Sequence, residues 1–160
     1  MADLNMTDVV SATPTLAAGT YAAGDAFGTG AIALANATKN AQTAVIVSVT
    51  LRDKTTQAAD VDVLFFSQNP ASSTLTDNAA VTIADADLAA YYLGHVPIRG
   101  TDYSTFADNC AACLPKLNLA VKTTGTGTAA NTLYAVIVAR EAVTIASASD
   151  YTLAVGLLQD

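Results

Sequence analysis

Residues 44–52, Ala44-Val45-Ile46-Val47-Ser48-Val49-Thr50-Leu51-Arg52, hold the pattern that decides the fold class. From Val45 to Leu51 every second residue is valine or leucine, whereas Ser48, Thr50 and Arg52 occupy positions between them. A period of two is the spacing of side chains that share one face of a β-strand. The stretch therefore predicts a half-buried strand whose odd-numbered residues face the core.

Segments of similar length recur on both sides of this strand. Residues 61–66 alternate in the same way and are more apolar at their end, where Asn69-Pro70 stops the run. Residues 142–146 and 151–158 have the composition of two further strands. We count about eight strands at the spacing that is typical of a β-sandwich or barrel.

The last third of the chain contains two longer apolar segments. Residues 117–121 alternate between apolar and polar, residues 123–132 are rich in Gly and Thr, and the segment 133–140 is apolar at successive positions up to Ala139. This order predicts a hairpin with a long loop. We therefore predict an all-β protein: a single antiparallel β-sandwich of jelly-roll-like form over residues 31–160.

One short helix is expected between the strands, over residues 85–94. Asp85 is a suitable residue to cap its start, and Gly94 is placed to stop it. The following Val96-Pro97-Ile98 can lie only at a sheet edge or a strand end, because proline has no amide donor. Residues 102–115 are expected to form an irregular loop.

Residues 1–30 are expected to form an extended N-terminal arm. The segment is dominated by Ala, Thr, Gly and Asp, and its sizeable side chains between Val10 and Gly30 are Leu16, Tyr21 and Phe27. A segment of this composition does not pack on itself, so it drapes over its own domain, reaches a neighbouring subunit or stays disordered. We predict that Leu16, Tyr21 and Phe27 contact a capsid surface or another subunit.

The charge balance excludes some partners. Seven Lys and Arg against 14 Asp and Glu give the 160-residue chain a formal net charge of −7, without a basic cluster. Nucleic acid and anionic membrane surfaces are therefore not expected as partners. The first eight residues have neither a positive region nor an apolar stretch, so we expect synthesis in a cytoplasm.

The residues able to carry chemistry are few. Cys110 and Cys113 have the spacing of half a zinc site or of a redox pair, but a second pair is missing. His95 is the single histidine, and it has no nucleophile motif beside it, so we expect it to cap the helix end. We assign no catalytic residue and no cofactor; Cys110 and Cys113 are the sole metal candidates, and ordinary thiols are the favoured interpretation.

Two segments resemble a family of small structural proteins of tailed phages. They are DVLFFSQNPASSTLTDN at residues 62–78 and SDYTLAVGLLQD at residues 149–160. The similarity continues through residues 85–96 and 133–140, so it covers most of residues 45–160 and leaves out the segment before Ala31.

The resemblance implies a virion component without enzymatic activity. It suggests a cement or decoration protein that binds the major capsid protein outside the shell, often as a homotrimer, after synthesis in the bacterial host. A tail or head-fibre component, or a carbohydrate-binding β-sandwich, is the alternative.

A homotrimer is also expected from the run Leu133–Val138. Its apolar residues at successive positions, with Tyr134 among them, predict a strand that is buried on both faces. We therefore predict that Tyr134 lies at a subunit or capsid contact.

Overall fold

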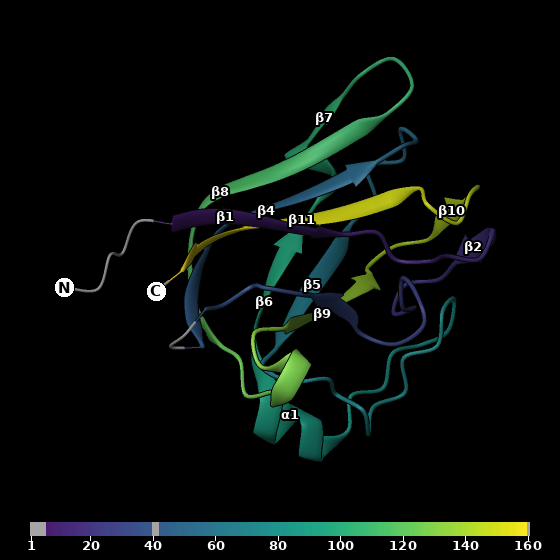
Figure 1. The fold of residues 1–160 in the computed structure, drawn as a ribbon. Coiled ribbons are helices and arrows are strands. Elements are labelled where there is room, and N and C mark those ends of the chain that lie inside the picture. Colours follow the sequence, from purple (N-terminus) through teal and green to yellow (C-terminus); the bar gives the residue numbers. More distant parts are fainter. Residues whose placement is uncertain (1–5, 40–41, 160) are drawn as a thin grey trace.

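The computed structural model describes residues 6–39 and 42–159, which form a sandwich of two antiparallel sheets (Figure 1). The first sheet has the strand order β1-β11-β4-β8-β7, with bounds Met6–Ala12, Tyr151–Gln159, Thr43–Asp53, Cys110–Lys122 and Tyr103–Thr105. The second has the order β3-β9-β5-β6, with bounds Ile32–Leu34, Leu133–Ala139, Val61–Phe66 and Tyr92–Ile98. A short ribbon pairs β2 (Gly19–Tyr21) with β10 (Val143–Ile145) at one end.

The strand pairing is that of a jelly roll. With the short strands β2, β7 and β10 set aside, eight described strands remain. They pair first with last (β1 and β11), second with seventh (β3 and β9), third with sixth (β4 and β8) and fourth with fifth (β5 and β6), all antiparallel. A long hairpin rolled into two sheets has this pairing. The predicted jelly-roll-like, all-β sandwich is confirmed.

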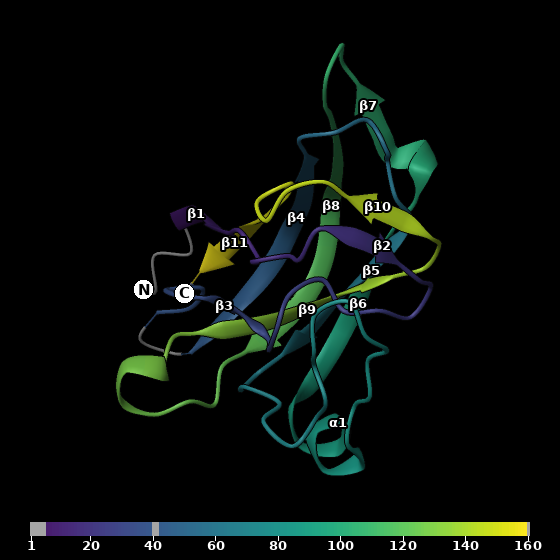
Figure 2. The ribbon, with the colours of Figure 1, turned by 90° about the vertical axis from the view of Figure 1, so that its right-hand side faces the viewer.

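The core lies between the inner faces of the two sheets (Figure 2). Its largest fully buried side chains are Tyr21, Tyr151, Phe27, Phe65, Phe66, Leu34, Ile46, Leu51, Ile98, Leu133, Ile137 and Ile145. Phe66 belongs to a second, smaller cluster on the outer face of the four-stranded sheet. The other eleven pack in the sandwich interior or beneath its end ribbon.

The strand predicted from residue 44 is present as β4, but half of its predicted inner face is wrong. Against β11, Val47 is an extra, bulged residue between Ile46 and Ser48, whereas on the other side β8 places the three residues 116–118 opposite Val47. A bulge changes which residues face inward. As a result Ile46 is fully buried with Val49, whereas Val45 and Val47 are half-exposed.

The segment before Ala31 is part of the sandwich, which corrects the prediction of a separate arm. β1 pairs with β11 along its whole length. Leu16, Tyr21 and Phe27 have exposed fractions of 3%, 0% and 1%, so they fill this chain's own core and are not available as contacts to another protein. The Phe27 ring lies 5.4 Å from that of Tyr21 and 5.0 Å from that of Tyr151. Draping over its own domain, one of the three arrangements weighed for this segment, is the observed one.

Asp77 holds this segment in place from the loop that follows β5. Its carboxylate accepts hydrogen bonds from the amides of Ala17 (2.6 Å) and Gly28 (2.8 Å) and from the hydroxyl of Tyr21 (2.7 Å). Burial, followed by the hydrogen bond to Asp77, raises the pKa of Tyr21 well above its ordinary value. The phenol therefore stays a donor to Asp77 in neutral and mildly alkaline solution.

The predicted hairpin between residues 117 and 140 is wrong. β8 lies in the five-stranded sheet and β9 in the other, and residues 123–132, with the 3-10 turn Gly127–Ala129, cross between them. The predicted loop at residues 102–115 is instead a hairpin of β7 and β8, preceded by the 3-10 turn Gly100–Asp102. Local alternation located these strands but could not identify their partners.

The helix α1 spans Asp85–Tyr91 and leads directly into β6. Gly94 does not stop the helix, because it lies inside β6 at a φ of +150°, with the Leu119 side chain 3.1 Å from where its Cβ would be. Pro97 lies on β6 opposite Asp62. Since β6 is an edge strand, its predicted edge position is confirmed.

Removal of residues 1–30 is expected to unfold the protein, because it deletes β1 and three buried anchors of the core. Each large buried side chain contributes several kcal/mol, about 3 for an aromatic residue, so the three anchors together are comparable with the whole stability of an ordinary domain. Circular dichroism and thermal melting measure the loss of folded structure. Removal of residues 1–5 alone is the control and should leave a cooperative transition. A folded chain lacking residues 1–30 would contradict the structure.

Candidate functional site

The outer face of the four-stranded sheet is partly covered by its own chain. Val136 and Val138 of β9 point outward yet are each 3% exposed, because Leu75, Val81 and Ile83 pack over this side. The double burial that the sequence indicates is thus satisfied within one chain. This double burial is therefore no longer an argument for a homotrimer, and the homotrimer stays a prediction.

The part of this face nearest β6 is left open and collects aromatic side chains. Phe66 lies between Tyr134 on β9 and Tyr92 on β6 in the cross-strand register, and its ring contacts that of Tyr92 at 5.7 Å. In the next row Leu64 lies opposite His95. Phe66 is fully buried, whereas Tyr92 and Tyr134 are half-exposed above it.

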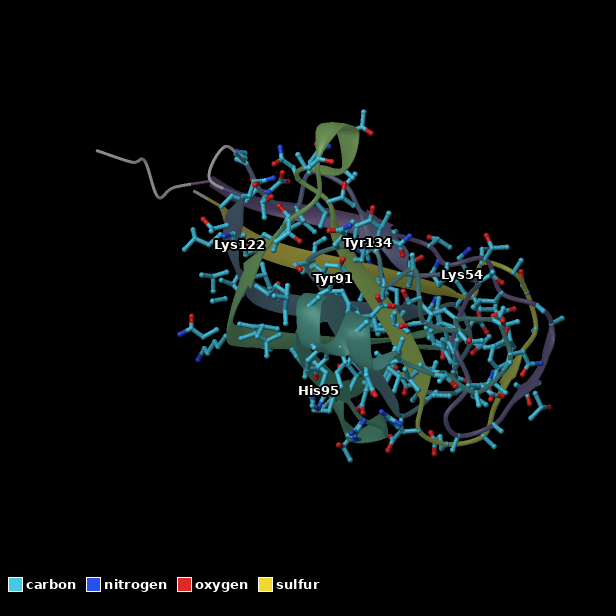
Figure 3. The ribbon with its side chains drawn as sticks, turned by 90° about the horizontal axis from the view of Figure 1, so that it is seen from below. Lys54, Tyr91, His95, Lys122 and Tyr134 are labelled. Carbon is cyan, nitrogen blue, oxygen red and sulfur yellow. The ribbon has the colours of Figure 1, made fainter. Side chains whose placement is uncertain are left out.

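The helix α1 extends this surface. Leu88 and Tyr91 are three residues apart, so they lie on one side of the helix; Leu88 is 48% exposed, and Tyr91 packs on the same cluster as Tyr134. Tyr91 and Tyr134 lie near each other at the centre of Figure 3, with His95 beyond α1. We name this surface the tyrosine patch, and its members are Leu64, Leu88, Tyr91, Tyr92, His95 and Tyr134.

Hydrogen bonding within the tyrosine patch is incomplete. The Tyr92 hydroxyl and His95 Nδ1 are 2.8 Å apart, so His95 is a strand residue bonded to a tyrosine and does not cap a helix end as predicted. Burial and the negative charge of Asp62 raise the pKa of Tyr92. Within the described chain the hydroxyls of Tyr91 and Tyr134 have no hydrogen-bond partner, so both can bond to another molecule.

A buried carboxylate that is paired with two partly exposed arginines lies beside the tyrosine patch. Asp62, on the same face of β5 as Leu64, accepts from Arg99 Nη2 at 2.8 Å and from Arg140 Nε at 2.7 Å. Burial alone would raise the pKa of Asp62, but the two guanidinium groups outweigh it and lower that pKa. Arg99 also donates to the carbonyls of Val61 and Ile98. The pair thus joins β5, β6 and the end of β9.

Cys110 and Cys113 are not placed to share a metal ion or a disulfide. They lie on β8, where residues three apart point to opposite faces, and Cys110 is buried whereas Cys113 is exposed. His95 lies on the other sheet. No group of three metal-ligating side chains comes together in residues 6–39 and 42–159.

The buried thiol belongs to a cluster around Asp53, which is 1% exposed. The Asp53 carboxylate accepts from the amide and hydroxyl of Thr55 at 2.8 and 2.6 Å, from the Tyr151 hydroxyl at 3.2 Å and from Cys110 Sγ at 3.5 Å. Burial, followed by the charge of Asp53, raises the pKa of Cys110. The thiol is held protonated, which disfavours nucleophilic or redox chemistry.

Of the four predicted contact residues, Tyr134 alone lies at a surface that another molecule can reach. The sequence interpretation missed Leu88, Tyr91 and Tyr92. The signal was present, because Leu88 and Tyr91 share a helix face and Tyr92 is the next residue. No local pattern in the sequence, however, indicates that this helix lies beside β9.

No protein-family model and no curated protein sequence matches the chain. The resemblance to phage structural proteins therefore stays a prediction. Within the described residues, no helix is long and apolar enough to cross a membrane.

Asp62→Asn tests the ion pair. A carboxyl whose pKa is lower in the folded state stabilises the fold above its unfolded pKa, about 4, and this contribution disappears as the pH falls through the folded pKa. We expect the substitution to lower the free energy of unfolding by about 2 kcal/mol at pH 7 and by much less near pH 2. Urea unfolding at both pH values measures it, with the exposed Asp85→Asn as control. If the substitution lowered the free energy of unfolding equally at both pH values, the charge of Asp62 would not be the cause of the stabilisation.

Cys113→Ser is expected to leave the thermal transition unchanged, because the side chain is exposed on a strand. Cys110→Ser is expected to cost about 1 kcal/mol or less, since a hydroxyl can replace the thiol as a donor to Asp53. Differential scanning calorimetry with and without added zinc is the measurement. A zinc-dependent stabilisation of the wild type that the double variant loses would show that the cysteines bind metal after all.

Proposed function

We propose that this protein is a non-enzymatic structural component of a phage virion, a cement or decoration protein that binds the major capsid protein on the outside of the shell. It is made in the cytoplasm of the bacterial host and acts as an oligomer on the assembled head. The observation that carries the proposal is the tyrosine patch, which offers an apolar surface and two unbonded hydroxyls on a rigid sheet.

The chemistry of the tyrosine patch suits a protein partner. Interface centres are enriched in tyrosine, and a few such residues supply most of the binding free energy. Half of the six tyrosines of this chain are gathered here, whereas Tyr21 and Tyr151 are fully buried. The resemblance of residues 45–160 to phage structural proteins points to the same class of function. A jelly roll by itself does not, since many unrelated functions share a fold.

A carbohydrate-binding module is the second candidate, because sugar rings stack on half-exposed tyrosine faces. The tyrosine patch is the specific observation that favours it. A tail or head-fibre location is the further alternative among virion components. Binding to a glycan array without binding to phage heads would favour the carbohydrate module.

The test uses phage heads that lack this protein. Tyr91→Ser with Tyr134→Ser removes the two rings with free hydroxyls, and we expect the dissociation constant for heads to rise by about 30-fold or more, the range of a hot spot. Both side chains are only half-buried, so circular dichroism should show an intact fold. Co-sedimentation across a range of protein concentrations measures the binding.

Phe106→Ser is the matched control, because Phe106 is a 59% exposed aromatic residue in the turn between β7 and β8, and this hairpin and α1 lie at opposite ends of the molecule (Figure 1). It should bind heads as the wild type does. If the wild type, the double tyrosine variant and Phe106→Ser bound heads equally, the tyrosine patch would not be the contact. If even the wild type ignores heads, the decoration role is wrong.

A further inference from the structure

The outer face of the five-stranded sheet has no covering segment in the described chain, and most of its side chains are small and uncharged. One cross-strand row runs through Ser11, Ala154, Thr50 and Cys113, on β1, β11, β4 and β8. These residues alternate with the core positions Leu153, Val155, Val49 and Leu51, so they point away from the sandwich. We name this outer surface the open sheet face.

The charges on the open sheet face differ from those of the whole protein. None of its outward positions in the described strands carries a carboxylate, although the chain has 14 acidic residues and a formal net charge of −7. Arg52 and Lys122 are outward positions near opposite ends of the face. Two copies of an acidic protein repel each other, and contact through this face keeps their exposed carboxylates apart.

The open sheet face also has the size of an interface. Its four long strands, spaced about 4.8 Å apart and about nine residues long at about 3.3 Å per residue, cover about 600 Å², and the short β7 adds to this. Stable interfaces bury about 800 Å² on each partner. Two twisted sheets with small side chains pack face to face at about 10 Å, as in any β-sandwich, so the face fits a copy of itself.

The shape of the open sheet face also favours a second copy of this chain as the partner. Val9, on β1, is 65% exposed and projects from it. At the end of the face where β4 begins, an apolar groove of about 440 Å³ lies between Val45, Ala120 and Leu158 of this sheet and Leu93 of the other sheet. Its lining also includes Ala44 and Val121, which face the core. A projection and a hollow on one face suit two-fold pairing, because each copy presents both to its partner.

We propose that a second copy of this chain packs on the open sheet face, so that two sandwiches stack sheet to sheet about a two-fold axis. This deepens the oligomeric part of the proposed function and replaces the predicted homotrimer with a two-fold dimer. The tyrosine patch lies on the outside of the other sheet and stays accessible in such a pair.

The first test is the mass in solution. Light scattering after size exclusion should give about 32 kDa, twice the 16.2 kDa of the chain. Thr50→Glu places a carboxylate in the middle of the open sheet face, where it would meet the partner, and should give a folded monomer by circular dichroism. Thr128→Glu adds the same charge at an exposed position in the turn between β8 and β9 and should remain a dimer.

A second measurement needs no substitution, because Cys113 is a native probe in the middle of the open sheet face. Its alkylation by a maleimide should slow by about tenfold or more when the protein concentration is raised above the dissociation constant, whereas the buried Cys110 stays unreactive. In Thr50→Glu the rate should be independent of concentration.

A monomeric wild type whose Cys113 reacts at one rate throughout would overturn the proposal, as would a dimer or trimer that Thr50→Glu leaves intact. Neither measurement involves phage heads. Loss of pairing with normal head binding would count against the self-interface alone, and normal pairing without head binding would count against the decoration role alone.

Discussion

The pairing of β1 with β11 is the contact on which the rest of the structure depends. It places Val10 opposite Val155, so the two ends of the chain lie in one sheet (Figure 1). β11 in turn pairs with β4, and β4 with β8, which connects the first strand to the centre of the sheet. Pairing between distant segments has a high loop-closure cost that a strand pair alone does not offset. The buried anchors Leu16, Tyr21 and Phe27 contribute the apolar burial that makes this closure favourable.

Aspartates hold the long loops in a protein whose cysteines are both free. Asp150 accepts from the amides of Ala146 and Ser147, and Asp87 accepts from the amide of Ser72 and the hydroxyl of Ser73. A buried carboxylate is costly unless it is hydrogen-bonded. Here backbone amides and hydroxyls are the donors, and of the buried aspartates in the described chain only Asp62 has a cationic partner. This explains how an acidic chain with few cations buries carboxylates in its loops.

The two sheets present different outer faces, so the two proposed contacts would use separate surfaces. The four-stranded sheet carries aromatic rings, partly covered by residues 67–84 of its own chain, and its exposed remainder is apolar with free hydroxyls. The five-stranded sheet has no covering segment in the described chain, and its outer face carries mostly small side chains, with Val9 projecting from it and an apolar groove at one end. Aromatic rings supply affinity at a compact site, whereas a face of small side chains must bury area over its whole extent. The surfaces lie on opposite sides of one core, so occupying one does not block the other.

The sequence by itself located most strands from β4 onward, because alternation of apolar and polar residues is a local property, but it did not predict β1, β2, β3 or β7. It placed β4, β5, β10 and β11, the short helix and the edge position of Pro97, and it indicated that β9 is buried on both faces. Of the four contact residues that it predicted, Tyr134 lies at the surface and the other three lie in the core. Only the tertiary structure decided that β8 and β9 belong to different sheets, that a bulge at Val47 turns Ile46 inward, and that the first 30 residues complete the sandwich. The physical reason is that strand partners are chosen by hydrogen bonds and burial between segments up to about 150 residues apart in this chain, and such contacts leave no periodic trace in either segment.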